Sequence, residues 1–353
     1  MKIDAARRRT IHTAVPLGRG RVGLAGRELV DFSSNDYLGL AGDPRLTAAS
    51  CEAVQRWGNG ARGSRLISGS HPLYDRVEER LAALLAVERV LVFNSGFQAN
   101  STVLPALVGR DGVLLLDRAA HRSLVDGAKV SEARLLRYRD EEHLERLLQC
   151  SEGSERWIVT ESIFSTDGRQ PDLDSLRRLA DRVGARLFVD EAHAFGIAGK
   201  QGVGLCENAD VKVGTFGKAV GAFGAFVATS TAFADRLINR CAGLIYSTAL
   251  PPAVLGAVDR ALEIIPEMEV ERQAVCALAN LLGGSSHILS RVLGDEATAV
   301  SVGEALREEG FAVGVLRPPT VAKGRASLRI SLSALHRPDQ VVRLGGALAK
   351  WSN

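Results

Sequence analysis

Between about residues 75 and 230, short runs of β-branched and other apolar residues alternate with amphipathic stretches whose apolar positions recur every three or four residues. The runs predict buried strands, and the amphipathic stretches predict helices between them. The expected strands are residues 90–93, 113–116, 157–160, 186–189, 211–215 and 225–228, and the clearest expected helices are residues 75–87, 141–150 and 174–183. This alternation is typical of βαβ units, so we expect an α/β fold with a mostly parallel sheet covered on both faces.

The pattern changes beyond Pro251, where a long helical stretch reaches about residue 282. Shorter mixed elements follow at residues 311–315 and 327–331, and a last helix begins at Pro338. This change predicts a smaller α+β domain after the large one. The expected divisions are residues 1–45, an N-terminal segment packing with the small domain; residues 46–250, the large domain; and residues 251–353, the small domain.

Composition excludes several classes of protein. The 353-residue chain has a formal net charge of only +3, with basic residues spread along it apart from the run Arg7 to Arg9, so nucleic-acid binding is not expected. The five cysteines lie far apart without a CxxC pair, which disfavours a disulfide framework or a structural zinc site, and no metal is expected. The N-terminus lacks the apolar core of a signal peptide and no stretch suits a membrane span, so we expect a cytoplasmic protein.

Ligands of parallel sheets bind at the carboxyl ends of the strands, so chemistry is sought there. Lys218 lies in VGTFGKAVG, residues 213–221, directly after an expected strand and between glycines that let another group approach its amine. Asp190 ends the preceding expected strand, and His193 follows three residues later. Taken singly, Lys218 reads as a surface lysine in a glycine-rich turn and Asp190 as a loop cap.

Together, the amine and the carboxylate match the needs of pyridoxal 5'-phosphate (PLP). A lysine holds this cofactor as a Schiff base, and a carboxylate keeps its pyridine nitrogen protonated, so that the ring can stabilise a carbanion at the Cα of a substrate. We therefore predict a PLP site with Lys218 as the Schiff-base lysine, Asp190 as the ring partner and His193 beside them.

The phosphate of PLP is best held by backbone N–H groups at a helix N-terminus. The expected strand 90–93 runs into a Ser-Gly turn and then a helical stretch, which predicts donors at Ser95, Gly96 and Phe97. The hydroxyl of Thr215 is a further candidate. An ordinary strand-to-helix turn is the alternative for this segment.

Two further polar residues follow expected strands. His121 lies beyond strand 113–116 and is predicted to stack flat on the cofactor ring, whereas Ser165 lies beyond strand 157–160. Ser165, like His193, is predicted to donate a hydrogen bond to the phenolate oxygen of the ring. Each alone reads as a solvated loop residue, and only the convergence of several strand ends favours the cofactor site.

These segments together resemble the α-oxoamine synthases, PLP enzymes of fold type I, the aspartate-aminotransferase fold. The resemblance runs over nearly the whole chain and also rests on four other segments: FSSNDYLGL at 32–40, GSRLISG at 63–69, IYSTALPP at 245–252 and RPPTV at 317–321. Within the family, the first, third and fourth of these resemble the members that make 8-amino-7-oxononanoate in biotin biosynthesis.

The resemblance implies a decarboxylating condensation of an amino acid with an acyl thioester. For the members just named, the substrates are L-alanine and pimeloyl-CoA or pimeloyl-carrier protein. Lys218, once displaced from the cofactor, is implied as the general base at the alanine Cα. Arg329 matches the position that holds the amino-acid carboxylate, a task suited to a bidentate guanidinium.

Further residues match positions of the family that contact substrates or the partner subunit. Asn35 and His121 match positions near the amino-acid substrate, and Thr320 and Arg7 resemble contacts with the acyl substrate. Thr248 resembles a residue that reaches the phosphate in the partner subunit, so a homodimer with shared active sites is implied.

Two alternatives stay open. One is a glycine-using relative, such as 5-aminolevulinate synthase or 2-amino-3-ketobutyrate CoA ligase. The other is a non-catalytic subunit of the same fold, against which the joint retention of Lys218, Asp190 and His121 speaks. The chain also departs from the family pattern, with Ala322 where proline is usual after the Pro-Pro-Thr-Val run.

Overall fold

The structure is a computed structural model that describes residues 9–151 and 155–351. The chain folds into two compact units, which are described separately. Unit 1 comprises residues 1–39, 165–169 and 269–353, and unit 2 comprises residues 40–164 and 170–268. The domain boundaries expected near residues 45 and 250 stay predictions.

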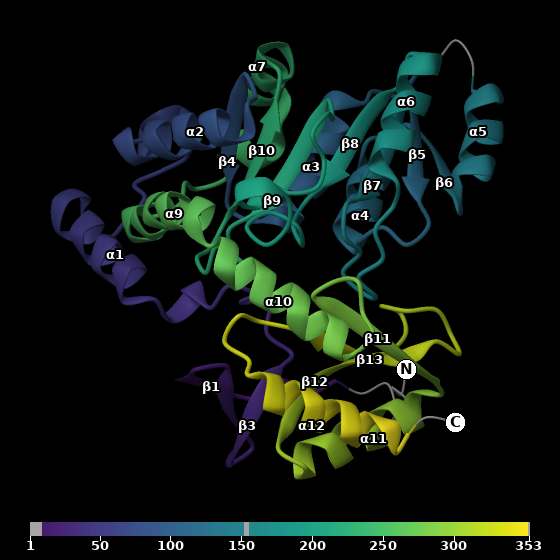
Figure 1. Cartoon of the computed structure of the whole chain (residues 1–353). Helices are drawn as coiled ribbons and strands as arrows, with labels where there is room; N and C mark the ends of the chain where they lie inside the picture. Colours follow the sequence, from purple (N-terminus) through teal and green to yellow (C-terminus); the bar gives the residue numbers. More distant parts are fainter. Residues whose placement is uncertain (1–8, 152–154, 352–353) are drawn as a thin grey trace. The chain divides into compact units, whose positions relative to one another are not determined.

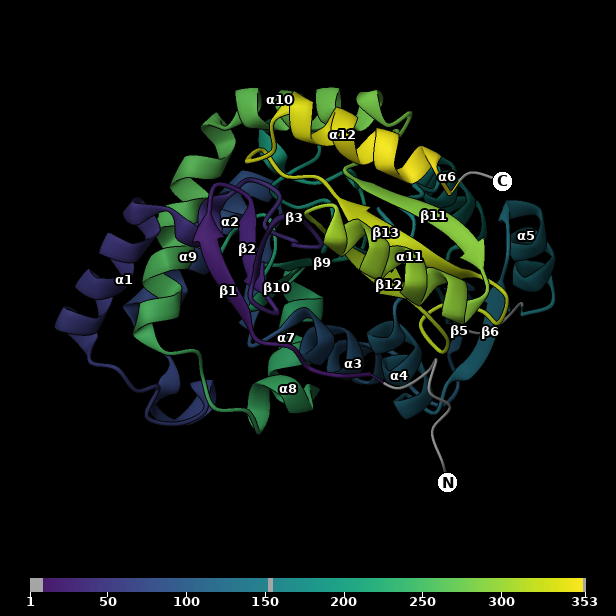
Figure 2. The ribbon, with the colours of Figure 1, turned by 90° about the horizontal axis from the view of Figure 1, so that it is seen from below.

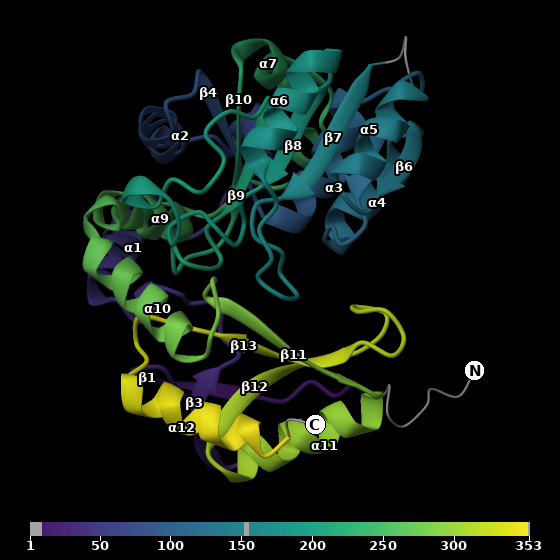
Figure 3. The same ribbon diagram turned by 45° about the vertical axis from the view of Figure 1, so that its right-hand side comes forward.

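Unit 2 is built on a seven-stranded sheet in the order β4-β10-β9-β8-β7-β5-β6 (Figures 1 and 3). Its strands are β4 (Arg89–Phe93), β5 (Val113–Asp117), β6 (Arg134–Tyr138), β7 (Arg156–Glu161), β8 (Arg186–Asp190), β9 (Val211–Thr215) and β10 (Ala225–Thr229). From β9 to β6 every neighbouring pair is parallel, whereas β10 is antiparallel to both β9 and β4. The expected mostly parallel sheet is confirmed. The sequence pattern missed β6, because this edge strand carries arginines and lacks an uninterrupted apolar run.

Helices cover both faces of this sheet. One apolar core joins the sheet to α3 (Gly96–Leu107), α4 (Arg122–Val130), α7 (Thr231–Arg240) and α8 (Ala242–Ile245), and a second joins it to α5 (Glu141–Gln149) and α6 (Leu173–Val183). The remaining helical elements of unit 2 are η2 (Leu40–Gly42), α1 (Pro44–Trp57), η3 (Arg65–Gly69), α2 (Pro72–Leu85), η4 (Lys200–Gly202), α9 (Pro252–Ile264) and η5 (Ile265–Glu267). The predicted helices at 75–87, 141–150 and 174–183 are confirmed as α2, α5 and α6.

Unit 1 contains a six-stranded sheet in the order β1-β2-β3-β12-β13-β11. Its elements are β1 (Ala14–Gly18), β2 (Arg21–Leu24), β3 (Arg27–Phe32), α10 (Glu269–Leu281), β11 (Ile288–Gly294), α11 (Glu296–Glu308), β12 (Phe311–Leu316), β13 (Ala326–Ser331) and α12 (Pro338–Ala349). Helices α11 and α12 lie on one face of the sheet, as Figure 2 shows from that side. The predicted elements at 311–315, 327–331 and from Pro338 are confirmed.

The expectation of one long helix from Pro251 to about residue 282 is wrong. The stretch is divided into α9, the short 3-10 helix η5 and α10. Pro266 lies in η5, and a proline has no N–H for the helical ladder and its ring crowds the preceding turn. In the described parts of the chain, no helix is long and apolar enough to cross a membrane.

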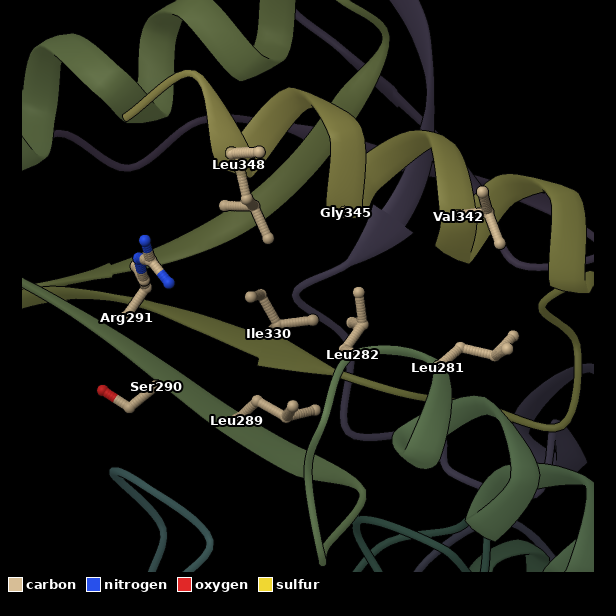
Figure 4. Close-up of a pocket in the computed structure, with 10 residues that line it drawn as sticks. Leu281, Leu282, Leu289, Ser290, Arg291, Ile330, Val342, Gly345 and Leu348 are labelled. Carbon is tan, nitrogen blue, oxygen red and sulfur yellow. The ribbon is translucent and has the colours of Figure 1, made fainter. Parts of the chain in front are cut away.

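Unit 1 also contains an open pocket of about 440 Å³ between α12 and the strands β11 and β13 (Figure 4). Leu281, Leu282, Leu289, Ile330 and Leu348 line it, together with a few further residues that include Ser290 and Arg291. None of the residues predicted for the functional site lines this pocket, so it is separate from the chemistry described below.

Helices α3 and α4 approach each other closely at Gly127. A Cβ atom added at Gly127 would lie 2.3 Å from the backbone oxygen of Asn100 and 3.0 Å from the α-carbon of Ser101. Any larger residue must therefore push α4 away from α3. Gly346 in α12 is a natural control, because a Cβ added there meets nothing within 4 Å.

We expect Gly127→Ala to lower the free energy of unfolding by about 1–3 kcal/mol, because the overpacked helices must separate. Gly346→Ala should instead raise it by up to about 1 kcal/mol, since alanine restricts the unfolded chain and favours a helix. Urea unfolding followed by circular dichroism measures both. Equal effects of the two substitutions would show that α3 and α4 are not in this close contact.

His336 in unit 1 is a buried, neutral histidine. Its Nδ1 accepts the backbone N–H of Ser333 at 3.1 Å, and its Nε2 lies 3.0 Å from the carbonyl oxygen of Asp31. Burial lowers the pKa of His336 to about 4, although the hydrogen bond to Asp31 and the charge of its carboxylate oppose this shift. Protonation of Nδ1 would also break the bond from Ser333, so the folded state favours the uncharged ring.

We predict that this histidine makes stability fall as pH drops from about 6.5, the usual pKa in an unfolded chain, to about 4. In that window the unfolded state binds the proton and the folded state does not, so the loss reaches about 3 kcal/mol. Urea midpoints at pH 7 and pH 4.5 should differ less in His336→Gln than in the unsubstituted protein. An unchanged difference would contradict the burial of a neutral ring.

Candidate active site

The predicted amine and carboxylate lie at the carboxyl edge of the same sheet. Asp190 ends β8, and β9 runs beside it in parallel, with Asp190 opposite Val213. Lys218 follows β9, and its Nζ lies 2.8 Å from Nε2 of His193. The parallel pairing of two adjacent strands therefore brings together three predicted site residues, Asp190, His193 and Lys218.

The carboxylate of Asp190 is buried, with 5% of the residue exposed. Its Oδ1 accepts the backbone N–H of Ala192 at 2.8 Å, and its Oδ2 accepts the side-chain amide of Asn100 at 2.6 Å. Among the described residues, no lysine, arginine or histidine forms an ion pair with this carboxylate. A buried negative charge held by neutral donors alone suits a cationic ligand group, such as a protonated ring nitrogen.

His121 lies near both groups. Loss of hydration lowers the pKa of its imidazole, the negative charge of Asp190 opposes that shift, and the positive charge of Lys218 adds to it. The ring is anchored through Nδ1, which lies 2.8 Å from the hydroxyl of Ser123, while the residue as a whole stays exposed. A neutral imidazole is compatible with the predicted stacking on an aromatic cofactor.

The sequence analysis missed Asn100 and Ser123, which link Asp190 to His121. The Nδ2 of Asn100 donates to Asp190 and lies 3.0 Å from Oγ of Ser123. Both residues are buried, with 1% and 0% exposed. The available signal was a single asparagine within the otherwise apolar face of α3, where this residue type is unfavourable unless its side chain has partners.

Glu191, also missed, anchors the segment that carries Asp190 and His193. Its buried carboxylate accepts hydrogen bonds from the hydroxyl of Ser162 at 2.7 Å and from the backbone N–H groups of Leu205 and Cys206. Burial raises the pKa of Glu191, although these hydrogen bonds and the positive charge of Lys212 oppose the shift. The carboxylate thereby ties the ends of β7 and β8 to the loop that precedes β9.

The predicted phosphate donors form the N-terminus of α3. Ser95 is the N-cap, and its Oγ accepts the N–H of Gln98 at 3.1 Å. Gly96 and Phe97 lie in the first turn, whose N–H groups have no acceptor within the helix. A Cβ atom added at Gly96 would lie 3.9 Å from Cβ of Thr215, so the helix end and the end of β9 are adjacent. The phosphate-binding role of these residues stays a prediction, since the hydroxyl of Thr215 donates to the backbone oxygen of Gly224 at 2.9 Å.

Thr248 lies beside the turn that leads into α3. Its backbone forms an isolated bridge with Ser64, and its carbonyl oxygen accepts the side-chain amide of Asn94 at 2.7 Å. The side chain itself is exposed.

In unit 1, Arg329 of β13 is held on several sides by oxygen atoms. Its Nε donates to the backbone oxygen of Ser165 at 2.6 Å, and its Nη1 to the hydroxyl of Ser331 at 2.7 Å. Its Nη2 lies 3.2 Å from Oδ1 of Asn35 and 3.3 Å from the hydroxyl of Tyr37. All four of these partners are uncharged groups. They orient the guanidinium and do not neutralise its positive charge.

Tyr37 is a further residue that the sequence analysis missed. Burial raises the pKa of its phenol to about 12, against the opposing charge and hydrogen bond of Arg329. The phenol therefore keeps its proton and donates to Oδ1 of Asn35 at 3.0 Å.

The other predicted residues of unit 1 are only partly placed. Ser165 lies with Arg329 in unit 1, whereas the other predicted cofactor residues belong to unit 2. Thr320 is exposed, and its hydroxyl lies 3.3 Å from the guanidinium of Arg9. Arg7 lies outside the residues that the structure describes, so the arginine found beside Thr320 is Arg9.

The residues of unit 2 fit PLP. They provide an amine beside a histidine, a buried carboxylate that accepts hydrogen bonds from two neutral donors, and a helix N-terminus for a phosphate. In the described parts of the chain, no group of three or more His, Cys, Asp or Glu side chains could hold a metal ion.

Comparisons with known proteins agree with this description. Residues 27–348 match the family of class I and II aminotransferases. An 8-amino-7-oxononanoate synthase of Anaeromyxobacter dehalogenans is 43% identical over 362 residues, which cover 97% of this chain and 91% of that protein. An 8-amino-7-oxononanoate synthase of Geobacter sulfurreducens is 42% identical, and the match covers 97% of this chain and 93% of that protein.

Solved structures give the same picture. A serine palmitoyltransferase from S. paucimobilis with bound PLP and myriocin has a TM-score of 0.92 at 26% identity, covering 96% of this chain and 92% of its own. An 8-amino-7-oxononanoate synthase from Francisella tularensis has a TM-score of 0.79 at 29% identity, covering 91% and 97%. The predicted fold, a type I PLP enzyme, is confirmed by these neighbours.

Proposed function

The chain belongs to the class I and II aminotransferase family, and from this premise we propose that it is a PLP-dependent acyltransferase that condenses L-alanine with a pimeloyl thioester. The product is 8-amino-7-oxononanoate for biotin biosynthesis, and the acyl carrier is CoA or a carrier protein. The observation that carries the chemistry is the contact of Lys218 with His193, three residues after the buried carboxylate of Asp190. The names of relatives more than 40% identical over nearly the whole chain support the choice of substrates.

Bound PLP supplies an electron sink for negative charge that develops at the Cα of the amino acid. Lys218 is the residue that would hold the aldehyde carbon of the cofactor. Its amine, oriented by His193, then removes the proton from the alanine Cα as a general base. Asp190 keeps the proton on the ring nitrogen, because its buried charge has no cationic partner in the described part of the chain. His121 would cover one face of the ring, and the N-terminus of α3 would bind the phosphate.

Residues of unit 1 are assigned to the substrates. Arg329 binds the carboxylate of alanine, and Asn35 and Tyr37 hold the guanidinium in the orientation for a bidentate contact. Thr320 and the arginines of the N-terminal segment, Arg7 and Arg9, bind the acyl substrate. Loss of CO2 after the new carbon–carbon bond has formed makes the condensation irreversible.

We also propose that the enzyme acts as a homodimer with shared active sites. Several large apolar side chains near the site are exposed: Ile67 by 83%, Phe97 by 51%, Phe223 by 56% and Tyr246 by 83%. Exposed apolar groups on adjoining segments are typical of a surface that another chain covers. Thr248, with its exposed side chain in the same region, would reach the phosphate bound by the partner subunit.

Release of thiol tests the substrate assignment. We expect purified protein loaded with PLP to release CoA from pimeloyl-CoA with L-alanine. With glycine or L-serine, kcat/KM should be at least about tenfold lower, because a site shaped for one methyl group discriminates by this order. The same assay with succinyl-, acetyl- and palmitoyl-CoA covers the related enzymes. Faster release with glycine and a short acyl-CoA would assign the chain to the glycine-using relatives instead.

Lys218→Ala tests the cofactor lysine. The unsubstituted protein should absorb visible light and lose that band on borohydride reduction, which fixes the cofactor to a peptide that contains Lys218. Lys218→Ala should retain no covalent cofactor and lose activity by about 10²–10⁴-fold, the usual contribution of a general base. Lys200→Ala, at an exposed position, is the matched control and should behave like the unsubstituted protein. Normal turnover by Lys218→Ala would refute the assignment.

A further inference from the structure

Asn100 has a position that none of the assigned roles explains. It lies within α3 with 1% of its surface exposed, and its side-chain nitrogen contacts two different groups of the site. One is Oδ2 of Asp190 at 2.6 Å, and the other is Oγ of Ser123 at 3.0 Å. Ser123 in turn contacts Nδ1 of His121 at 2.8 Å. A chain of hydrogen bonds thus joins the ring-nitrogen partner to the stacking histidine.

The negative charge of Asp190 determines which group donates and which accepts in each of these hydrogen bonds. An ionised carboxylate only accepts hydrogen bonds, so the amide nitrogen of Asn100, and not its oxygen, must face it. One N–H then binds Asp190 and the other binds Ser123. The amide oxygen Oδ1 is left buried without a hydrogen-bond partner among the described residues. A buried oxygen without a partner lowers stability, so stability of the fold alone does not account for this asparagine.

The same reasoning gives the donor and acceptor roles of Ser123 and His121. Because Oγ of Ser123 accepts a hydrogen bond from Asn100, its single O–H proton is available for Nδ1 of His121. The backbone N–H of Ser123 also points at this nitrogen, at 3.3 Å, where His121 caps α4. Nδ1 is therefore an acceptor, and the proton of the neutral imidazole lies on Nε2. The lowered pKa of His121 agrees with a neutral ring.

We propose that Asn100 is a positioning residue for the cofactor site, which orients the Asp190 carboxylate and, through Ser123, holds His121 as the neutral Nε2–H tautomer. Each oxygen of Asp190 has one protein donor, from Asn100 or from Ala192, and each keeps lone pairs for a ring nitrogen. A neutral His121 also adds no positive charge beside the protonated ring. This inference rests on the PLP part of the proposed function and is independent of the choice of amino acid and thioester.

The affinity for PLP tests the first part of the proposal, that Asn100 orients the carboxylate of Asp190. Asn100→Leu removes both donors at similar volume, and we expect the Kd for PLP of the apoprotein, measured by its visible absorbance, to rise about 10- to 100-fold, as for a lost hydrogen bond to a charged group. Ser123→Ala is the matched control. It keeps the contact between Asn100 and Asp190, so its Kd should rise by less than about fivefold.

The tautomer of His121 tests the second part of the proposal, that Asn100 acts on His121 through Ser123. It is measured in the apoprotein and without turnover. In ¹⁵N-histidine-labelled protein, the two ring nitrogens of His121, assigned by comparison with His121→Gln, should show a proton on Nε2 alone. Both Asn100→Leu and Ser123→Ala should shift them toward a mixture of tautomers. In Ser123→Ala the shift is partial, because the 3.3 Å contact from the backbone N–H of residue 123 remains after the 2.8 Å hydroxyl contact is lost. A purely structural asparagine would leave this signature unchanged in every variant that folds.

Asn100→Asp provides the same test if Asn100→Leu fails to fold. It has nearly the same shape, but its carboxylate cannot donate and repels Asp190, so PLP should again bind more weakly. If both variants fail to fold, the tautomer of His121 in Ser123→Ala still tests the hydrogen bond from Ser123 to His121. The inference is overturned if a folded Asn100 variant binds PLP within twofold of the unsubstituted protein, or if Ser123→Ala leaves the tautomer of His121 unchanged.

Discussion

The site depends on one buried charge, the carboxylate of Asp190, held by amide donors in place of a cation. Such a charge is costly to bury unless donors surround it, and here they come from its own turn and from α3. This requirement explains several distant features. Gly127 lets α4 approach α3 closely, Glu191 fixes the segment behind the carboxylate, and the parallel pairing of β8 with β9 brings Lys218 to the same edge. The large sheet can thus be understood as a frame that presents an amine and a buried carboxylate at the same edge.

Much of this could be predicted from the sequence, because the signals are local. Buried strands are short apolar runs, and Asp190 and Lys218 follow two of them directly, so βαβ topology places them at one edge. Asn100, Ser123 and Glu191 escaped prediction because their meaning lies in partners far along the chain. Asn100 and Asp190 are 90 residues apart, and a polar residue within a helix gives no sign of which group it will meet. The break at Pro266 was visible in the sequence and was passed over in favour of a continuous apolar pattern.

In unit 1 the same physical logic applies to a cation. Arg329 is oriented by a backbone oxygen, a hydroxyl, an amide oxygen and a phenol that burial keeps protonated. These contacts fix the guanidinium and leave its charge for a carboxylate ligand. Family resemblance pointed to Arg329 and Asn35, but Tyr37 emerged only from the packing. A serine palmitoyltransferase and an 8-amino-7-oxononanoate synthase share this fold, so the fold alone does not identify a substrate.

The central claim is that one aromatic cofactor spans the distance between Lys218 and Asp190. A crystal structure of the protein purified with PLP measures this most directly. The account predicts continuous electron density from Nζ of Lys218 to a ring whose nitrogen lies about 2.7–3.0 Å from a carboxylate oxygen of Asp190. Density attached to another lysine, or a ring nitrogen facing away from Asp190, would contradict it.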